Sequence, residues 1–180
     1  MKAKGRIKES RWVFTIDVTL PNGEVEHIGD GDVPLDSHGK PTRGPDFYID
    51  KRITYEGEPA RIDLIKDGKN VPLTEFAITE ASSEFKKEFG HEPTELPGSI
   101  ADDNRSIFQR AYLAAIDKGK PPAEAAEAAA RNTPFVKNRV RLGFTDVRVV
   151  PTAQMDKIVY GNPPRVREAP HGAEIVARKP

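Results

Sequence analysis

The residues best suited to acid–base chemistry lie around a loop and the start of an expected helix over residues 100–118. They are His91, Glu92, Asp102 and Arg105. An imidazole changes its charge near neutral pH, a carboxylate can assist it, and an arginine stabilises developing negative charge. We therefore predict catalytic roles for these four residues. The simpler interpretation is that Asp102 complements the helix dipole and that His91 is an ordinary loop residue.

A second group of residues suits the binding of anions. Lys137 and Arg141 are four residues apart on an expected helix over residues 134–142, Arg139 lies between them, and Arg148 follows on an expected strand. Arginine offers a planar fork of donors that matches phosphate oxygens. The pattern predicts nucleic-acid binding by Lys137, Arg139, Arg141 and Arg148. The alternative is a solvated basic face without a ligand.

Charge is unevenly distributed along a chain whose formal net charge is zero. Residues 56–103 carry twelve acidic and five basic side chains, whereas residues 131–150 carry five basic side chains and one acidic side chain. A separation of this kind suits an anionic partner at one end of the molecule.

Several other kinds of site are excluded or disfavoured. There are no cysteines, so disulfides, thiolate metal sites and cysteine nucleophiles are excluded. Asp30-Gly31-Asp32, with Asp36 and His38, offers oxygens that could bind calcium, but it lacks the glycine and distal glutamate of an EF-hand loop, and a plain turn is preferred. We expect neither a metal nor a cofactor.

The periodicity of apolar residues predicts an α+β fold, in which an N-terminal antiparallel β meander is followed by a cluster of short helices and one or two C-terminal strands. Residues 11–20 alternate apolar and polar side chains, and Asn22-Gly23 after them favours a hairpin turn. Residues 29–45 are rich in turn formers. Helices are expected over 80–89, 100–118, 122–131 and 134–142, and late strands over 145–150 and 157–160.

The same patterns predict how the chain is organised. We expect a loose basic arm over residues 1–9, a single α+β domain over 10–160 and a Pro-rich C-terminal tail over 161–180. No apolar run is long enough to span a membrane, and the basic N-terminus has no apolar segment behind it, so we expect no signal peptide.

Stretches in the second half resemble C-terminal toxin domains of bacterial polymorphic toxins, such as the tips of Rhs, hemagglutinin-like and type VI secretion effectors. The resemblance lies in residues 96–104 (LPGSIADDN), in Phe108-Gln109-Arg110-Ala111-Tyr112, and in Arg139 through Leu142-Gly143-Phe144. It implies a delivered antibacterial effector, most often a nuclease or nucleotide-modifying enzyme, paired with an immunity protein. No family motif is matched residue by residue, so no catalytic residue is carried over.

Together these patterns predict an effector domain that acts on nucleic acid or a nucleotide, without a metal if it is a nuclease. Its location would be the cytoplasm of a producing bacterium, with delivery by a specialised secretion system. The alternative is a non-catalytic protein-binding module: an adaptor, a phage or secretion-particle component, or an immunity-type partner.

Overall fold

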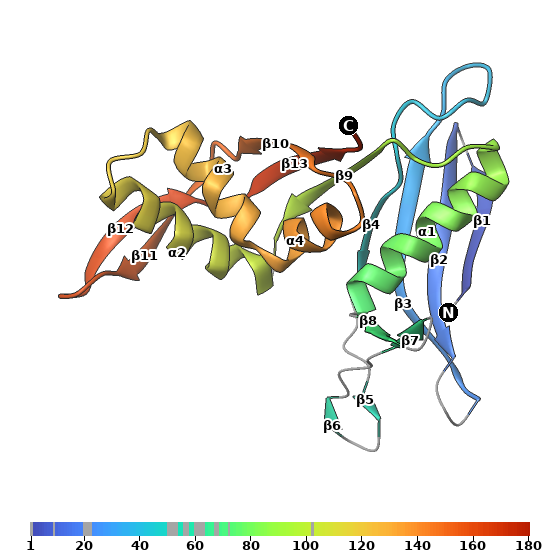
Figure 1. The fold of residues 1–180 in the computed structure, drawn as a ribbon, viewed down its shortest axis with the longest axis horizontal. Helices are drawn as coiled ribbons and strands as arrows, with labels where there is room; N and C mark the ends of the chain where they lie inside the picture. Colours follow the sequence, from blue (N-terminus) through green and yellow to red (C-terminus); the bar gives the residue numbers. More distant parts are fainter. Residues whose placement is uncertain are drawn as a thin grey trace. The chain divides into compact units, whose positions relative to one another are not determined.

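The chain folds into two units, residues 1–96 and 97–180, where we predicted one domain over residues 10–160. In this computed structural model (Figure 1) each unit combines strands with helices, and the predicted α+β class is confirmed. The residues described are 2–8, 10–19, 23–49, 54–55, 58–59, 64–66, 69–71, 73–101 and 103–180.

The first unit contains a four-stranded sheet in the order β1-β2-β3-β4, with neighbouring strands antiparallel. Its strands are β1 (Lys2–Lys8), β2 (Arg11–Thr19), β3 (Val25–Pro34) and β4 (Asp46–Ile49). Two short antiparallel pairs follow, β5 (Thr54–Tyr55) with β6 (Glu58–Pro59), and β7 (Leu64–Lys66) with β8 (Lys69–Val71). The expected meander is therefore present.

Two segments of the first unit differ from the prediction. The expected basic arm instead forms β1, because its residues pair with β2 from Lys2 opposite Asp17 to Lys8 opposite Arg11. The expected turn at Asp30-Gly31-Asp32 is instead part of β3, opposite β4. A Cβ at Gly31 would lie 2.2 Å from the Phe14 ring, so the glycine lets this ring pack directly against the β3 backbone. The turn expected at Asn22 lies outside the described residues.

Helix α1 (Leu73–Phe89) covers one face of this sheet (Figure 1). It begins seven residues earlier than predicted and ends before Gly90, whose φ of 80° favours glycine. Aromatic rings fill the interface: Trp12 stacks on Phe14 at 4.9 Å and meets Phe89 edge-on at 5.6 Å. The core also contains Ile16, Ile28, Val33, Phe47, Ala77, Ile78, Ala81 and Phe85.

The second unit packs three helices with a small sheet of order β10-β13-β9. Its elements are β9 (Glu95–Ile100), whose first two residues belong to the first unit, α2 (Asp103–Asp117), α3 (Pro122–Asn132), α4 (Pro134–Arg141), β10 (Asp146–Pro151) and β13 (Ala173–Arg178). Strands β11 (Met155–Tyr160) and β12 (Arg165–Pro170) form a hairpin inserted between β10 and β13. The loop predicted around His91 is followed by strand β9, which begins at Glu95.

The corner between α3 and α4 sets the position of the basic residues. Ala125, Ala126, Ala129 and Ala130 are buried, and their small side chains allow α3 to approach α2 closely. Thr133 ends α3 and caps α4, since its hydroxyl donates to Ala130 O at 2.6 Å and accepts from Val136 N at 3.3 Å. A proline directly follows the N-cap residue of both α3 and α4.

The C-terminal segment 161–180, predicted to be a tail, instead supplies β12 and β13. Strand β13 alternates buried Ala173, Ile175 and Ala177 with more exposed residues, which is the pattern of a half-buried strand. Its register with β10 runs from Ala173 opposite Pro151 to Arg178 opposite Asp146. All four prolines of this segment lie outside β13.

Candidate functional site

A hollow of about 390 Å³ lies at the α3–α4 corner of the second unit, lined by Arg131, Lys137, Val140 and Arg141. We call it the cationic hollow. Arg131 comes from the end of α3, and the other three come from α4. The helical spacing of Lys137 and Arg141 therefore places both on one face, as the sequence predicted.

The charges of this hollow are partly balanced by neighbours. Arg131 Nε lies 3.1 Å from Glu127 Oε1, one helical turn earlier. Lys137 Nζ donates to the neutral Asn132 side chain at 3.3 Å, which positions the ammonium group without cancelling its charge. Three basic side chains gathered around one hollow suit phosphate or another anion.

Arg139 has a different environment from the other basic residues of α4. Its side chain is 1% exposed, and its Cζ lies 3.6 Å from the centroid of the Phe135 ring. Its Nη1 also donates to Phe135 O at 3.1 Å. Residue 139 follows Lys137 by two positions, and this spacing turns its side chain from the solvent-facing side of the helix towards the interior. The predicted contact of Arg139 with nucleic acid is therefore replaced by a packing role.

The remaining predicted residues lie in separate places. Arg148 is exposed on β10 and is not among the residues that line the hollow. His91 and Glu92 belong to the first unit, where His91 Nδ1 lies 2.9 Å from Glu92 O and Glu92 pairs with Lys86 at 3.2 Å. Arg105 belongs to α2 of the second unit.

Asp102 lies outside the described residues. A shared acid–base site of His91, Glu92, Asp102 and Arg105 stays a prediction.

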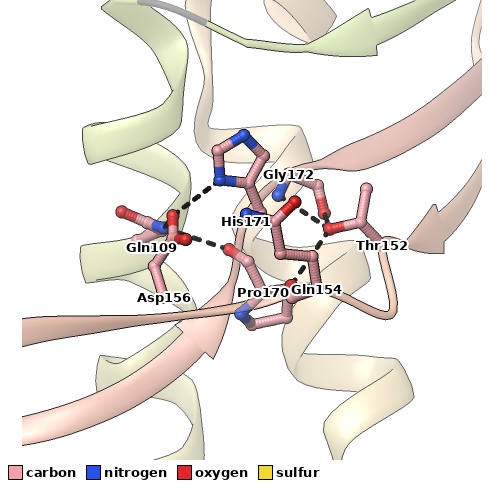
Figure 2. Close-up of polar contacts among 7 residues, drawn as sticks. All are labelled: Gln109, Thr152, Gln154, Asp156, Pro170, His171 and Gly172. Atoms are coloured by element: carbon pink, nitrogen blue, oxygen red, sulfur yellow. Dashed lines mark hydrogen bonds and ion pairs between the residues drawn. The ribbon is translucent and has the colours of Figure 1, made fainter.

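A polar cluster that the sequence did not reveal lies where the β11–β12 hairpin meets α2 (Figure 2). His171 Nδ1 donates to Asp156 Oδ2 at 2.8 Å. Gln109 Nε2 donates to the same carboxylate oxygen at 2.8 Å and to Pro170 O at 3.2 Å. The side chains of His171 and Asp156 are 32% and 27% exposed, whereas Gln109 is 6% exposed. Gln109 thus forms the buried side of the cluster, and His171 and Asp156 form its exposed side.

The ionisation of Asp156 follows from these contacts. The hydrogen bond from His171 lowers the pKa of the Asp156 carboxyl, and the hydrogen bond from Gln109 and the charges of His171 and Arg105 lower it further. Asp156 is therefore an anion at neutral pH. One function of the cluster is structural, because it holds the hairpin on α2 together with the ion pair between Arg167 and Asp117 at 2.9 Å.

No local signal in the sequence pointed to this cluster. His171 and Asp156 are fifteen residues apart, on either side of a hairpin, and Gln109 comes from a helix 47 residues before Asp156. The pairing of β11 with β12, which places Asp156 opposite Ala169, brings Asp156 close to His171, and the packing of the hairpin on α2 adds Gln109. A predicted hairpin over 155–170 would have been needed to find them.

The first unit has its own titratable cluster on the sheet face. His27 of β3 places Nδ1 3.2 Å from Asp17 Oδ1 and Nε2 3.2 Å from Asp30 Oδ2. A neutral imidazole donates from only one nitrogen, whereas the protonated ring donates from both. The hydrogen bond to Asp30 therefore contributes most to raising the pKa of His27, and the hydrogen bond to Asp17 raises it further.

The raised pKa of His27 predicts a pH dependence of stability. The stabilisation by His27 is fully present below the unfolded-state pKa, the ordinary histidine value of 6.5, and is lost as the pH rises through the folded-state value. The free energy of unfolding of the wild-type protein should exceed that of His27→Gln more at pH about 5.5 than at pH about 8. Urea unfolding followed by fluorescence measures this, since the single tryptophan, Trp12, lies in the same unit. A difference that does not change with pH would contradict the assignment.

The part of the chain that the structure describes offers neither a metal site nor a membrane-spanning helix. Within the described residues, no three His, Asp or Glu side chains are grouped so that they could hold a metal ion. Among the helices of the described part of the chain, none combines the length and apolar character needed to cross a membrane.

No family model matches the chain, and neither a curated protein nor a solved structure matches it. The residues and their geometry therefore carry the functional assignment.

Proposed function

We propose that this chain is an effector-type domain that binds nucleic acid or a nucleotide, with the cationic hollow of the second unit as its phosphate-binding site. The observation that carries the proposal is the grouping of Arg131, Lys137 and Arg141 around one hollow. The effector role is supported by the resemblance of residues 96–144 to polymorphic toxin domains.

The chemistry of the hollow suits a phosphate group. Arginine binds phosphate through two parallel hydrogen bonds, and lysine contributes a mobile point charge. Val140 gives the hollow an apolar wall, against which a sugar or base can pack. The hollow is open to solvent on the surface of two helices, so a polymer can pass across it.

Binding of fluorescently labelled single-stranded RNA and DNA, measured by anisotropy over a range of salt concentrations, tests the proposal. With three cations in contact with phosphates, the logarithm of the affinity should fall with the logarithm of salt concentration with a slope of about −2. A chain that binds neither oligonucleotide at low salt would overturn the proposal. A nucleotide that competes for binding would show that a single phosphate group is sufficient.

A second candidate is a non-catalytic protein-binding module, and one observation favours it. Val159 and Val166 face each other across the β11–β12 hairpin and are 62% and 66% exposed. A partner that covers this pair would remove exposed apolar surface from water. High-level expression without growth arrest, together with absent nucleic-acid binding, would favour this module, whereas toxicity relieved by a cognate immunity protein would favour the effector.

A further inference from the structure

We propose that His171, oriented by Asp156, is a general base for RNA cleavage. The inference rests on the proposed function, since it needs a phosphate-bearing polymer bound to the second unit. It assigns the acid–base role to a histidine of the same unit as the cationic hollow, instead of to His91.

The orientation of the imidazole is the first argument. Nδ1 donates to the Asp156 carboxylate at 2.8 Å, so the lone pair of the neutral ring resides on Nε2. Figure 2 shows Nε2 pointing away from Asp156. A carboxylate that fixes the tautomer while the second nitrogen remains available is the arrangement in which histidine acts as a base. The side chain is 32% exposed, so a ligand can reach it.

The second argument is that the backbone around His171 is held rigidly. His171 N donates to Gln154 O at 2.8 Å, and Gly172 N donates to Thr152 Oγ1 at 3.0 Å. A Cβ at Gly172 would lie 2.3 Å from Ile100 O, so this turn packs directly against the β9 backbone. A base held by several independent contacts needs little reorganisation when it reacts.

The third argument is the positive charge of Arg105, which acts on Asp156. Arg105 lies one helical turn before Gln109 on α2, and its charge contributes to the lowered pKa of Asp156. Its Nε atom is buried and has no hydrogen-bond partner among the described residues. A guanidinium at this position can stabilise the charge that develops on a phosphate during cleavage. Arg105, which the sequence predicted to stabilise charge, therefore lies in the same unit as this histidine.

The choice of RNA follows from the nucleophile. The chain has no cysteine, and the Thr152 hydroxyl is engaged with the carbonyl oxygens of Gly172 at 3.2 Å and Gln154 at 3.4 Å. RNA supplies its own nucleophile, the 2′-hydroxyl, next to every phosphate. In the part of the chain that the structure describes, no hydroxyl side chain is hydrogen-bonded to His171, so this base suits RNA, with its own 2′-hydroxyl, better than DNA.

Cleavage moves one proton onto His171 and exchanges one phosphorus–oxygen bond for another. Nε2 of His171 takes the proton of the 2′-hydroxyl, and the 2′-oxygen forms a bond to the adjacent phosphorus. The bond from phosphorus to the 5′-oxygen breaks, and the leaving 5′-oxygen takes a proton from water. The hydroxide so formed is neutralised by the proton that His171 releases. The products are a 2′,3′-cyclic phosphate end and a 5′-hydroxyl end.

The test compares the full chain with His171→Ala and Asp156→Asn on a mixture of structured and single-stranded RNA. Loss of the base should slow cleavage by roughly a thousandfold. Asp156→Asn, which changes a positioning residue, should slow it by roughly a hundredfold or more. The pH profile of cleavage by Asp156→Asn should also differ from that of the wild type, because the carboxylate no longer acts on the base. His38→Ala, in an exposed turn of the first unit, is the matched control and should cleave like wild type.

Binding of an RNA analogue in which every 2′-hydroxyl is replaced by hydrogen separates the two proposals. Absent binding of this analogue at low salt overturns the proposed function. Intact binding without cleavage of the RNA mixture overturns only the role of His171. Cleavage that survives in His171→Ala, is lost in His91→Ala, or extends to DNA also overturns it.

Discussion

Replacing both Lys137 and Arg141 by glutamate is expected to weaken nucleic-acid binding by roughly a hundredfold or more at low salt. The two side chains line the same hollow, one helical turn apart on α4. Reversal removes two cations and adds two anions, which repel the phosphates that Arg131 still attracts. The salt dependence should flatten as well, by about 0.7 in slope for each phosphate of a single strand that the variant no longer neutralises.

The control for this variant is Lys118→Glu with Lys120→Glu, in the exposed connection between α2 and α3. It changes the net charge of the same unit by the same amount, away from the hollow. Anisotropy titrations of both variants against one oligonucleotide distinguish the two effects. Equal weakening would show that binding follows overall charge, and the site assignment would then be wrong.

Replacing Arg139 by alanine is expected to lower the free energy of unfolding of the second unit by about 3 kcal/mol. The side chain is 1% exposed and lies over the Phe135 ring, so its removal leaves a void and ends the interaction between cation and ring. The void would reach β9, because a Cβ at Gly98 would lie 2.6 Å from Phe135 Cζ and 3.4 Å from Arg139 Nη2. Amide hydrogen exchange across α3 and α4 would measure the loss.

Arg139→Met separates this packing role from the nucleic-acid contact that the sequence predicted. Methionine fills much of the same space without a charge, so it should cost less stability than alanine. The folded Met variant should bind nucleic acid like wild type. A Met variant that keeps its stability but loses binding would show that Arg139 does contact nucleic acid.

Much of the fold could be predicted because local signals agreed with tertiary structure. Pro122, Pro134 and Thr133 mark the starts and ends of α3 and α4, and the structure places those boundaries within a residue of the prediction. The alternation of β2 placed Trp12, Phe14 and Ile16 in the core. In such segments, periodicity and capping chemistry point to the same element.

The failures occurred where a strand is specified mainly by the strand that it pairs with. Residues 2–8 suggested a polar arm because their charges mask a strand that is specified by its partner β2. The prolines of residues 161–180 suggested a tail, although β12 and β13 are held by β11 and β10. A strand set by its neighbours has a weak signal of its own.

Only those parts of the candidate site that depend on local helical spacing could be predicted. Helical spacing alone brings Lys137 and Arg141 together, and it also turns Arg139 inward, a distinction that the charge pattern did not make. Arg131 comes from the neighbouring helix, so predicting its place in the hollow would have required the geometry of the α3–α4 corner. His171 and Asp156 needed the β11–β12 hairpin, which no local pattern specified.

The most direct test of the central claim is an NMR titration of the ¹⁵N-labelled chain with a single-stranded oligonucleotide at low salt. We predict that the largest amide shift changes lie at Arg131, Lys137, Val140 and Arg141, and that they reverse when salt is added. Shift changes that are absent from α3 and α4, or that are confined to the sheet of the first unit, would contradict the account.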